Sequence, residues 1–420
     1  MGLTSGRRRW VVLALIFAGI VVSYIDRGNL SLAVVPIMRE FGYSPRIMGT
    51  LLSCFFWTYA IFQVPSGMLV DRYGIRRAYA ATFLLWSLAS ASMGISRGLA
   101  GFLTARLVLG MAESVGPLAS ISFIRRNFAS RQQGLPTAIY LAGQQVGPAV
   151  GALLGTWLLA TWGWRWMFIA TGLGALLWLV PWLIFAPADS RPEPVPASVA
   201  LPPGWQRAFA RPPLWAMMLF VFMAAYFMYF VLTWVPAYLM LVHKFNTLEM
   251  GHVLSTPLFS MAVAMTAFGA LADRLVRRTG KACAVRLWFM CGGMLGAGAL
   301  LFLFVIPNRG WVLPVLILAL CSWGVGTSNY WALAQYLSPA PLIGRSIGFL
   351  NTVAQVAGAA APLITGWLLG PARDFTVALA VAGSLPLIAC LVVALVGPAR
   401  LEAFRNSFES GVGAPLTPVM

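Results

Sequence analysis

The stretch GMLVDRYGIRR, residues Gly67–Arg77, decides the fold class of this chain. It follows a long apolar run, and a similar stretch, GALADRLVRR, follows another such run at residues 269–278. In both places an aspartate and several arginines come directly behind a segment long enough to cross a lipid bilayer. The repeat indicates two related halves, which is typical of transporters whose halves move against each other about a central site.

Apolar segments of spanning length recur along the whole chain. Of its 420 residues, 60% are hydrophobic and 10% are charged, which leaves too little polar surface to cover a water-soluble protein of this size. A spanning helix needs roughly 20 apolar residues. The sequence predicts twelve such helices, at residues 10–36, 48–70, 78–96, 99–124, 134–160, 166–187, 213–241, 248–272, 284–306, 311–336, 346–370 and 374–397.

A proline-rich polar stretch divides the predicted helices into six and six. Residues 1–187 are expected to form an N-terminal six-helix bundle, 188–212 a cytoplasmic linker, and 213–397 a C-terminal six-helix bundle. Residues 398–420 are expected to form a disordered cytoplasmic tail. The predicted fold is therefore an all-α membrane protein with two pseudo-symmetric bundles.

The basic residues predict the orientation in the membrane. The chain has 29 Lys and Arg against 11 Asp and Glu, and its net charge of +18 would suggest nucleic acid as a partner if it were soluble. Here, however, the cations fall mainly on alternate loops, on the side of the N-terminus. The positive-inside rule then predicts a multi-pass protein of the inner (plasma) membrane with both termini in the cytoplasm. The expected partners are lipid and a small molecule, without nucleic acid, and the protein is expected to act as a monomer.

Four ionisable residues lie at membrane depth on this map: Asp26, Arg27, Arg106 and Glu113. A charge at the centre of a membrane helix costs about 2.5 to 3.5 kcal/mol, so each of these groups must have a partner or face water. Asp26 and Arg27 point about 100° apart around their helix, so each needs a partner on another helix. Arg106 and Glu113 are two turns apart on one face, which is a spacing that frames a small-molecule site.

The functional and the structural interpretation of these four residues differ. Arginine forks bind carboxylates in a bidentate way, and carboxylates in an apolar environment bind protons readily, which together favour an anion and proton site. The alternative is a pair of buried salt bridges that only joins two helices.

The loop at residues 67–77 resembles the signature of the major facilitator superfamily. Four further stretches are similar to its anion:cation symporter family: residues 24–29, Arg106 with Glu113, residues 163–168, and residues 229–239. Pro117 lies one position earlier than in the sugar-acid carriers of that family, which leaves the substrate open. The resemblance implies the major facilitator fold, Asp26 and Glu113 as proton-coupling acids, and Arg27 and Arg106 as anion ligands or counter-ions.

Polar and aromatic residues at i, i+4 spacing support a lined cavity. Tyr59 with Gln63, Tyr140 with Gln144, and Asn351 with Gln355 follow this spacing, and such amides bond either a neighbouring helix or a ligand. The full set of predicted substrate-binding residues is Arg27, Arg106, Tyr24, Tyr59, Gln63, Gln144, Tyr229, Trp331, Asn351 and Gln355.

Two further patterns concern movement. The loop motif is interpreted as a gate, with Gly67, Asp71, Arg72, Gly74, Arg76 and Arg77 as its residues. Small residues recur every four positions from Gly143 to Gly155 and from Gly358 to Gly370, which predicts closely packed helices that are either static or able to slide.

The sequence predicts a secondary transporter that imports an organic anion, a carboxylate such as a sugar acid or aromatic acid, with protons by alternating access. It contains no phosphate-binding loop and no cysteine and histidine cluster at metal spacing, so neither enzymatic activity, a metal, nor a cofactor besides the coupling proton is expected. The alternatives are a proton-driven exporter of the same fold and a membrane receptor that does not transport.

Overall fold

The computed structural model describes residues 6–129, 132–187, 211–304, 308–338 and 343–413, and no β-strand occurs among them. Ten of the helices in these ranges are long and apolar enough to cross a membrane. One of the ten, Gly134–Phe185, is interrupted at Gly163, where a φ of +80° leaves the helical region, and so provides two spans. With the further helix Ile75–Gly94, these segments match the predicted spans, and the all-α membrane fold is confirmed.

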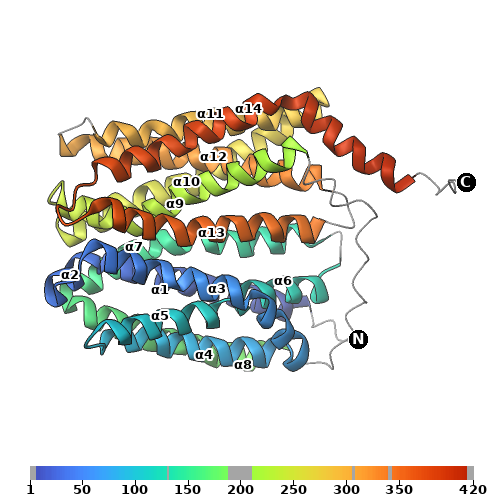
Figure 1. Cartoon of the computed structure of the whole chain (residues 1–420). Helices are drawn as coiled ribbons and strands as arrows, with labels where there is room; N and C mark the ends of the chain where they lie inside the picture. The colour runs from blue at the N-terminus through green and yellow to red at the C-terminus, as the bar shows by residue number, and fades with distance from the viewer. Residues whose placement is uncertain (1–5, 130–131, 188–210, 305–307, 339–342, 414–420) are drawn as a thin grey trace, which may run out of the picture. The chain divides into compact units, whose positions relative to one another are not determined.

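Eight α-helices form the first half of the described chain (Figure 1). The loop motif ends α3, and Gly74 separates it from the next helix with a φ of +83°, a backbone conformation that favours glycine. The bounds are α1 Gly6–Leu32, α2 Val34–Phe41, α3 Pro45–Tyr73, α4 Ile75–Gly94, α5 Leu99–Glu113, α6 Val115–Asn127, α7 Gly134–Ala175 and α8 Leu179–Phe185, with the 3₁₀ turn η2 at Leu176–Trp178.

Six α-helices form the second half of the described chain. Proline lies inside several of them, for example Pro257 in α10 and Pro362 in α13. The bounds are α9 Pro212–Leu241, α10 Thr247–Thr279, α11 Ala282–Ala297, α12 Val312–Leu337, α13 Ile343–Leu369 and α14 Thr376–Gly413, with 3₁₀ segments η4 at Gly298–Phe304 and η5 at Arg309–Trp311.

The beginning of the predicted tail is ordered. Helix α14 changes direction at Gly397, which has a φ of +73°, and then continues to Gly413. Leu401 is 1% exposed in a hydrophobic core, and the guanidinium of Arg405 lies over the Tyr336 ring. The expectation of disorder after Pro398 is therefore wrong for the residues up to Gly413, which are helical, and Leu401 anchors the beginning of this segment in the core. Residues 188–210 of the predicted linker and 414–420 of the tail lie outside the described residues.

The chain forms two compact units. The first consists of the described residues of Met1–Pro194 with Tyr229–Phe259 and Gly358–Ala378, and the second contains the rest. The first unit thus takes in parts of α9, α10 and α13 from the second half of the sequence.

The glycine repeat of α7 packs against α1 within the first unit. A Cβ atom on Gly147 would lie 2.5 Å from Cβ of Tyr24, and one on Gly155 would lie 2.5 Å from Leu32. Since real Cβ atoms do not approach each other this closely, glycine at position 147 allows the two helices to pack here, whereas the terminal methyl of Leu32 near Gly155 is able to move. The predicted close approach of these helices is confirmed.

Candidate functional site

Arg27 on α1 and Glu113 at the end of α5 form a buried ion pair. Arg27 Nε lies 2.6 Å from Glu113 Oε2, and Ser23 Oγ donates a hydrogen bond to the same oxygen at 2.7 Å. Ser23 precedes Arg27 by about one helical turn, so both side chains face α5. The side chain of Arg27 is 14% exposed and that of Glu113 is 0% exposed. The expected partner of Arg27 on another helix is thus Glu113.

Three aromatic rings surround the Arg27 guanidinium. Its central carbon lies 4.7 Å from the ring centre of Tyr24, 4.9 Å from Phe55 and 4.6 Å from Tyr59. These contacts hold the planar cation by its faces. Among the described residues, none accepts a hydrogen bond from Nη1 or Nη2 of Arg27. The two terminal nitrogens are therefore available to a ligand.

Asp26 faces a different set of side chains. Ser90 Oγ on α4 donates to Asp26 Oδ1 at 2.8 Å. Asn29, one turn after Asp26 on α1, donates to Thr171 Oγ1 on α7 at 2.8 Å. Asp26 is 0% exposed, and its Oδ2 has no hydrogen-bond partner within the described ranges. No ion pair to Asp26 occurs in that part of the chain. A buried carboxylate without a cation is costly, so the surroundings of Asp26 differ in kind from those of Glu113, which has Arg27 beside it.

Arg106 joins α5 to α3. Its Nε and Nη2 donate to the backbone carbonyls of Leu51 and Leu52 at 3.3 and 3.5 Å, and it is 2% exposed. The guanidinium also lies 5.2 Å from the ring centre of Phe55. Arg106 and Arg27 thus contact the same aromatic ring. Both hydrogen bonds observed for Arg106 go to the backbone, and its buried Nη1 has no partner in the described ranges.

An aromatic chain leads from Arg27 to α9 within the first unit. Phe55 stacks on Tyr59 at 5.5 Å and contacts Phe56 at 5.1 Å, and Phe56 lies 4.7 Å from Tyr229. The predicted ligands Tyr24, Tyr59 and Tyr229 are therefore connected to Arg27 directly or through neighbouring rings.

The predicted amides are less uniform. Gln144 Nε2 donates to Tyr140 OH at 3.0 Å, so this i, i+4 pair bonds internally, and Gln63 is half-buried on α3. Trp331, Asn351 and Gln355 belong to the second unit. There Trp331 packs against the hydrophobic core with its ring 5.2 Å from Tyr330, and Gln355 is 8% exposed.

The fold and these contacts can now be compared with known proteins. The chain matches the Major Facilitator Superfamily over residues 16–362. It belongs to the Major Facilitator Superfamily.

Relatives within the superfamily are transporters. The chain is 29% identical to the "D-galactonate transporter" of Escherichia coli O6:H1 over 91% of this chain and 95% of that protein. It is 28% identical to the "Probable galactarate/D-glucarate transporter GarP" of Escherichia coli K12, over 91% and 93%. It is 27% identical to the "Sodium-dependent phosphate transport protein 1, chloroplastic" of Arabidopsis thaliana, over 86% and 74%. The chain is accordingly a multi-pass membrane carrier and not an enzyme.

Solved structures show the same superfamily fold. A bacterial homolog of the human lysosomal transporter Spinster, in an inward-facing and unoccupied conformation, aligns with a TM-score of 0.74 at 16% identity, covering 98% of this chain and 100% of that one. The D-xylose-proton symporter aligns with a TM-score of 0.69 at 15% identity, covering 91% and 97%. At such identities the likeness concerns the fold alone.

The superfamily loop motif is tied to α8. Arg76 donates to the backbone carbonyl of Leu183, and Trp182 Nε1 donates to the carbonyl of Arg76 at 3.1 Å. Gly67 packs near Leu118, whereas Asp71 is half-buried and Arg72 and Arg77 are exposed. The role of this motif as a gate remains a prediction.

Sequence reasoning missed three residues of this superfamily member's site: Ser23, Phe55 and Ser90. Ser23 lies at i−4 from Arg27 and Phe55 at i−4 from Tyr59, so helical spacing could have indicated both. Ser90 is 64 positions from Asp26 along the chain, and no local pattern points to that contact.

Proposed function

We propose that this carrier imports an organic anion, a carboxylate such as a sugar acid or an aromatic acid, together with protons by alternating access. The observation that carries the proposal is the state of Arg27, whose Nε is held by Glu113 while Nη1 and Nη2 have no partner among the described residues. A guanidinium with two free parallel donors fits a carboxylate in a bidentate way. The names of the sugar-acid transporters to which the chain is similar support this substrate class.

The ion pair also provides a means of coupling anion and proton. A substrate carboxylate beside Arg27 shares the positive charge that otherwise stabilises ionised Glu113. Glu113 then binds a proton more tightly when the anion is present, and by reciprocity the protonated carrier binds the anion more tightly. Binding of both together is the requirement for symport.

Asp26 is the second proposed proton site. It is buried beside Ser90 and lacks a basic partner within the described ranges, so a bound proton would remove an uncompensated charge. Because the contact of Asp26 joins α1 to α4 and that of Glu113 joins α5 to α1, the two acids can respond to movements of different helices.

Alternating access requires contacts that open and close. In the first unit, Ser53 Oγ on α3 donates to the carbonyl of Ala359 on α13 at 2.7 Å, and Trp234 Nε1 on α9 donates to the carbonyl of Pro362 at 3.0 Å. These contacts join helices from the two halves of the sequence. We propose that these two hydrogen bonds break when α3 and α9 move away from α13 and open the site to one side of the membrane.

The proposed orientation places both termini in the cytoplasm of the inner (plasma) membrane, as the basic loops favour. An inside-negative potential then opposes each entering negative charge by about 2.3 kcal/mol per 100 mV. At least one co-transported cation per carboxylate removes this penalty, and we propose the proton as that cation because two buried acids, Asp26 and Glu113, can bind it.

Uptake by proteoliposomes tests the proposal. Labelled D-galactonate, D-glucarate and an aromatic acid are offered with and without an imposed pH gradient, acid outside. We expect at least one of these anions to accumulate only with the gradient. A proton-driven exporter would instead accumulate its substrate in the vesicles when the imposed gradient is reversed, acid inside. A receptor would bind the anion without any accumulation. Either result would contradict the proposal.

A further inference from the structure

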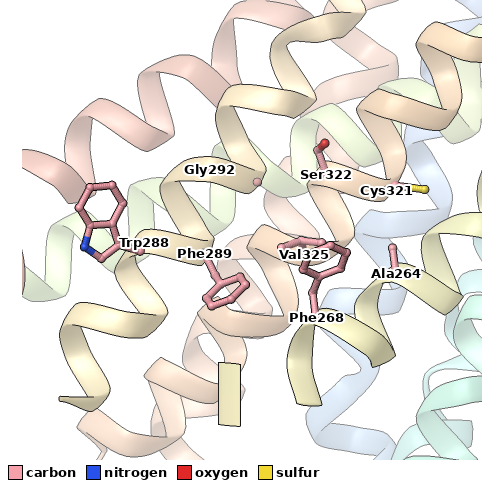
Figure 2. A pocket seen from close by; sticks show the side chains of 9 residues that line it. Ala264, Phe268, Trp288, Phe289, Gly292, Cys321, Ser322 and Val325 are labelled. Carbon is pink, nitrogen blue, oxygen red and sulfur yellow. The ribbon is translucent and has the colours of Figure 1, made fainter. Parts of the chain in front are cut away.

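A groove in the second unit is separate from the Arg27 site. It lies among α10, α11 and α12, encloses about 480 Å³ and has a predominantly apolar lining (Figure 2). Phe268, Phe289 and Val325 contribute apolar walls, and Trp288 at its side is 79% exposed. No charged side chain lines it among the described residues, so a carboxylate substrate has no counter-ion there.

A polar cluster fixes the three helices near the start of α11. Arg286 on α11 forms an ion pair with Asp273 on α10, with Nη2 2.8 Å from Oδ1. Its Nη1 donates to Asn329 Oδ1 on α12 at 3.4 Å. One guanidinium therefore links all three helices that line the groove, and the groove is formed before any ligand arrives.

A patch of cations lies beyond this cluster, where α10 ends and α11 begins. Arg274, Arg277, Arg278 and Lys281 are all exposed. With 33 residues α10 is roughly 50 Å long, so its last turns extend beyond the hydrocarbon core of about 30 Å. Along the helix axes, Arg278 lies roughly 15 Å from Phe268 and Lys281 roughly 10 Å from Trp288, whereas Arg277, nine residues after Phe268, points to the opposite side of α10.

We propose that this groove binds one anionic phospholipid of the cytoplasmic leaflet. An acyl chain lies along Phe268, Phe289 and Gly292, and the phosphate lies at the cations that follow Asp273. An apolar channel within the bilayer and a basic patch about half a leaflet away match the two ends of such a lipid. Trp288 lies between them, at the depth where tryptophan is favoured. The leaflet follows from the proposed orientation, whereas the lipid class does not depend on the transported substrate.

The headgroup contact is tested with phosphatidylglycerol added to the purified full chain in detergent, with phosphatidylcholine as the neutral lipid. Retained lipid is counted by native mass spectrometry, and the melting temperature is followed by titration. We expect phosphatidylglycerol to be retained and to raise the melting temperature. The double variant Arg278→Gln/Lys281→Gln, which removes two exposed cations of this patch, should weaken its binding roughly tenfold or more. The matched pair Arg125→Gln/Arg126→Gln, two exposed arginines at the end of α6, should leave it unchanged.

The acyl chain contact is tested at Gly292, where an added Cβ would meet nothing within 4 Å. Gly292→Leu places an apolar side chain in the groove from a position where its Cβ meets no other atom, and it should abolish retention of the lipid. Gly174→Leu, at an equally open glycine of α7, is the control. Should Gly292→Leu fold poorly, Trp288→Ala removes an exposed wall at little cost to folding and should also reduce retention.

Two results would overturn the proposal. Equal losses in the two double variants would show a general attraction of anions to a basic protein. Full retention of phosphatidylglycerol in folded Gly292→Leu would show that the acyl chain does not lie in the groove. Lipid retention and melting temperature are measured without transport, so a negative result for lipid binding is distinguishable from a negative result for the proposed symport.

Discussion

Arg27 is stabilised on every side except the one that a ligand would occupy. Glu113 holds Nε, and the rings of Tyr24, Phe55 and Tyr59 cover the guanidinium. These contacts orient the cation before the anion arrives. Its Nη1 and Nη2 stay available because no described residue binds them. Such preorganisation reduces the entropy lost on binding.

Replacement of Arg27 by lysine should therefore weaken anion binding. Lysine keeps the charge but loses the planar fork, and hydrogen bonds to charged groups contribute about 1.5 to 3 kcal/mol. We expect KM for uptake to rise roughly tenfold to a hundredfold in Arg27→Lys. Arg106→Lys, which loses bonds to the carbonyls of Leu51 and Leu52, should mainly lower thermal stability. An unchanged KM in Arg27→Lys would exclude Arg27 as a ligand.

Neutral substitutions of the two acids should separate exchange from accumulation. Asp26→Asn and Glu113→Gln imitate the protonated state, so counterflow, which needs no net proton release, should persist. Accumulation driven by a pH gradient should be lost because protonation no longer links the two fluxes. Both modes are measured on the same folded preparations. Accumulation that persists in both single variants and in the double variant would contradict the coupling role.

The stability of the same variants distinguishes the two acids. Glu113→Gln leaves the Arg27 cation buried without its carboxylate, and breaking a buried pair costs about 3 to 5 kcal/mol. Asp26→Asn strands no cation, since no ion pair to Asp26 occurs in the described part of the chain. We therefore expect a clear fall in melting temperature for Glu113→Gln and a small change for Asp26→Asn. Equal losses in both would indicate that Asp26 also serves to brace the helices.

At the level of helices, α3 and α13 are in unusually close contact. A Cβ on Gly49 would lie 2.6 Å from the carbonyl oxygen of Pro362 and 3.1 Å from Cα of Gly366. Only glycine allows this approach, which the hydrogen bond from Ser53 reinforces. The contact is thus sensitive to a single methyl group.

Gly49→Ala should separate these helices. Overpacking of this kind costs about 1 to 3 kcal/mol, so the melting temperature and Vmax of uptake should both fall. Gly348→Ala on α13, where an added Cβ meets nothing within 4 Å, is the matched control. Wild-type values in Gly49→Ala would show that α3 and α13 are not in contact in the resting carrier.

A second contact between elements, outside the spans, depends on pH. Glu40 on α2 accepts hydrogen bonds from Trp164 and Arg165 at the turn after Gly163. Partial burial acts to raise the pKa of Glu40, but these bonds and the Arg165 charge outweigh it and lower the pKa from its ordinary value of 4.5. The contact therefore stabilises the fold above pH 4.5, and this contribution is lost as the pH falls through the lowered pKa.

The variant Glu40→Gln tests this contact. We expect it to melt below the wild type at neutral pH and the difference to shrink below pH 4.5, where Glu40 takes up a proton. Arg165→Gln should behave in the same way. A difference that stays constant down to pH 3 would show that charge on Glu40 does not contribute.

At the level of the whole molecule, the proposed symport fixes the response to voltage. Uptake of a monocarboxylate alone would be opposed by about 2.3 kcal/mol at 100 mV, roughly fiftyfold in the accumulation ratio. With at least one proton per anion, an inside-negative potential imposed by a potassium gradient and valinomycin should leave uptake unchanged or increase it. A potential that slows uptake would indicate anion transport without protons.

Much of this architecture was predictable because it depends on local patterns. Apolar runs of spanning length give the helices, basic loops give the expected orientation, and the repeated motif at residues 67–77 and 269–278 indicates the fold. The cost of a charge in lipid identified Asp26, Arg27, Arg106 and Glu113 as residues that need partners.

Only the tertiary structure decided which partners these residues have. The sequence neighbours Asp26 and Arg27 face Ser90 and Glu113 on different helices, and Arg106 bonds backbone carbonyls of α3. The burial of Leu401 after Gly397 could not be predicted either, since the core in which it lies is built largely from residues of other helices. Helical periodicity fixes the direction in which a side chain points around its own axis, whereas its neighbour is set by the packing of segments far apart in the chain.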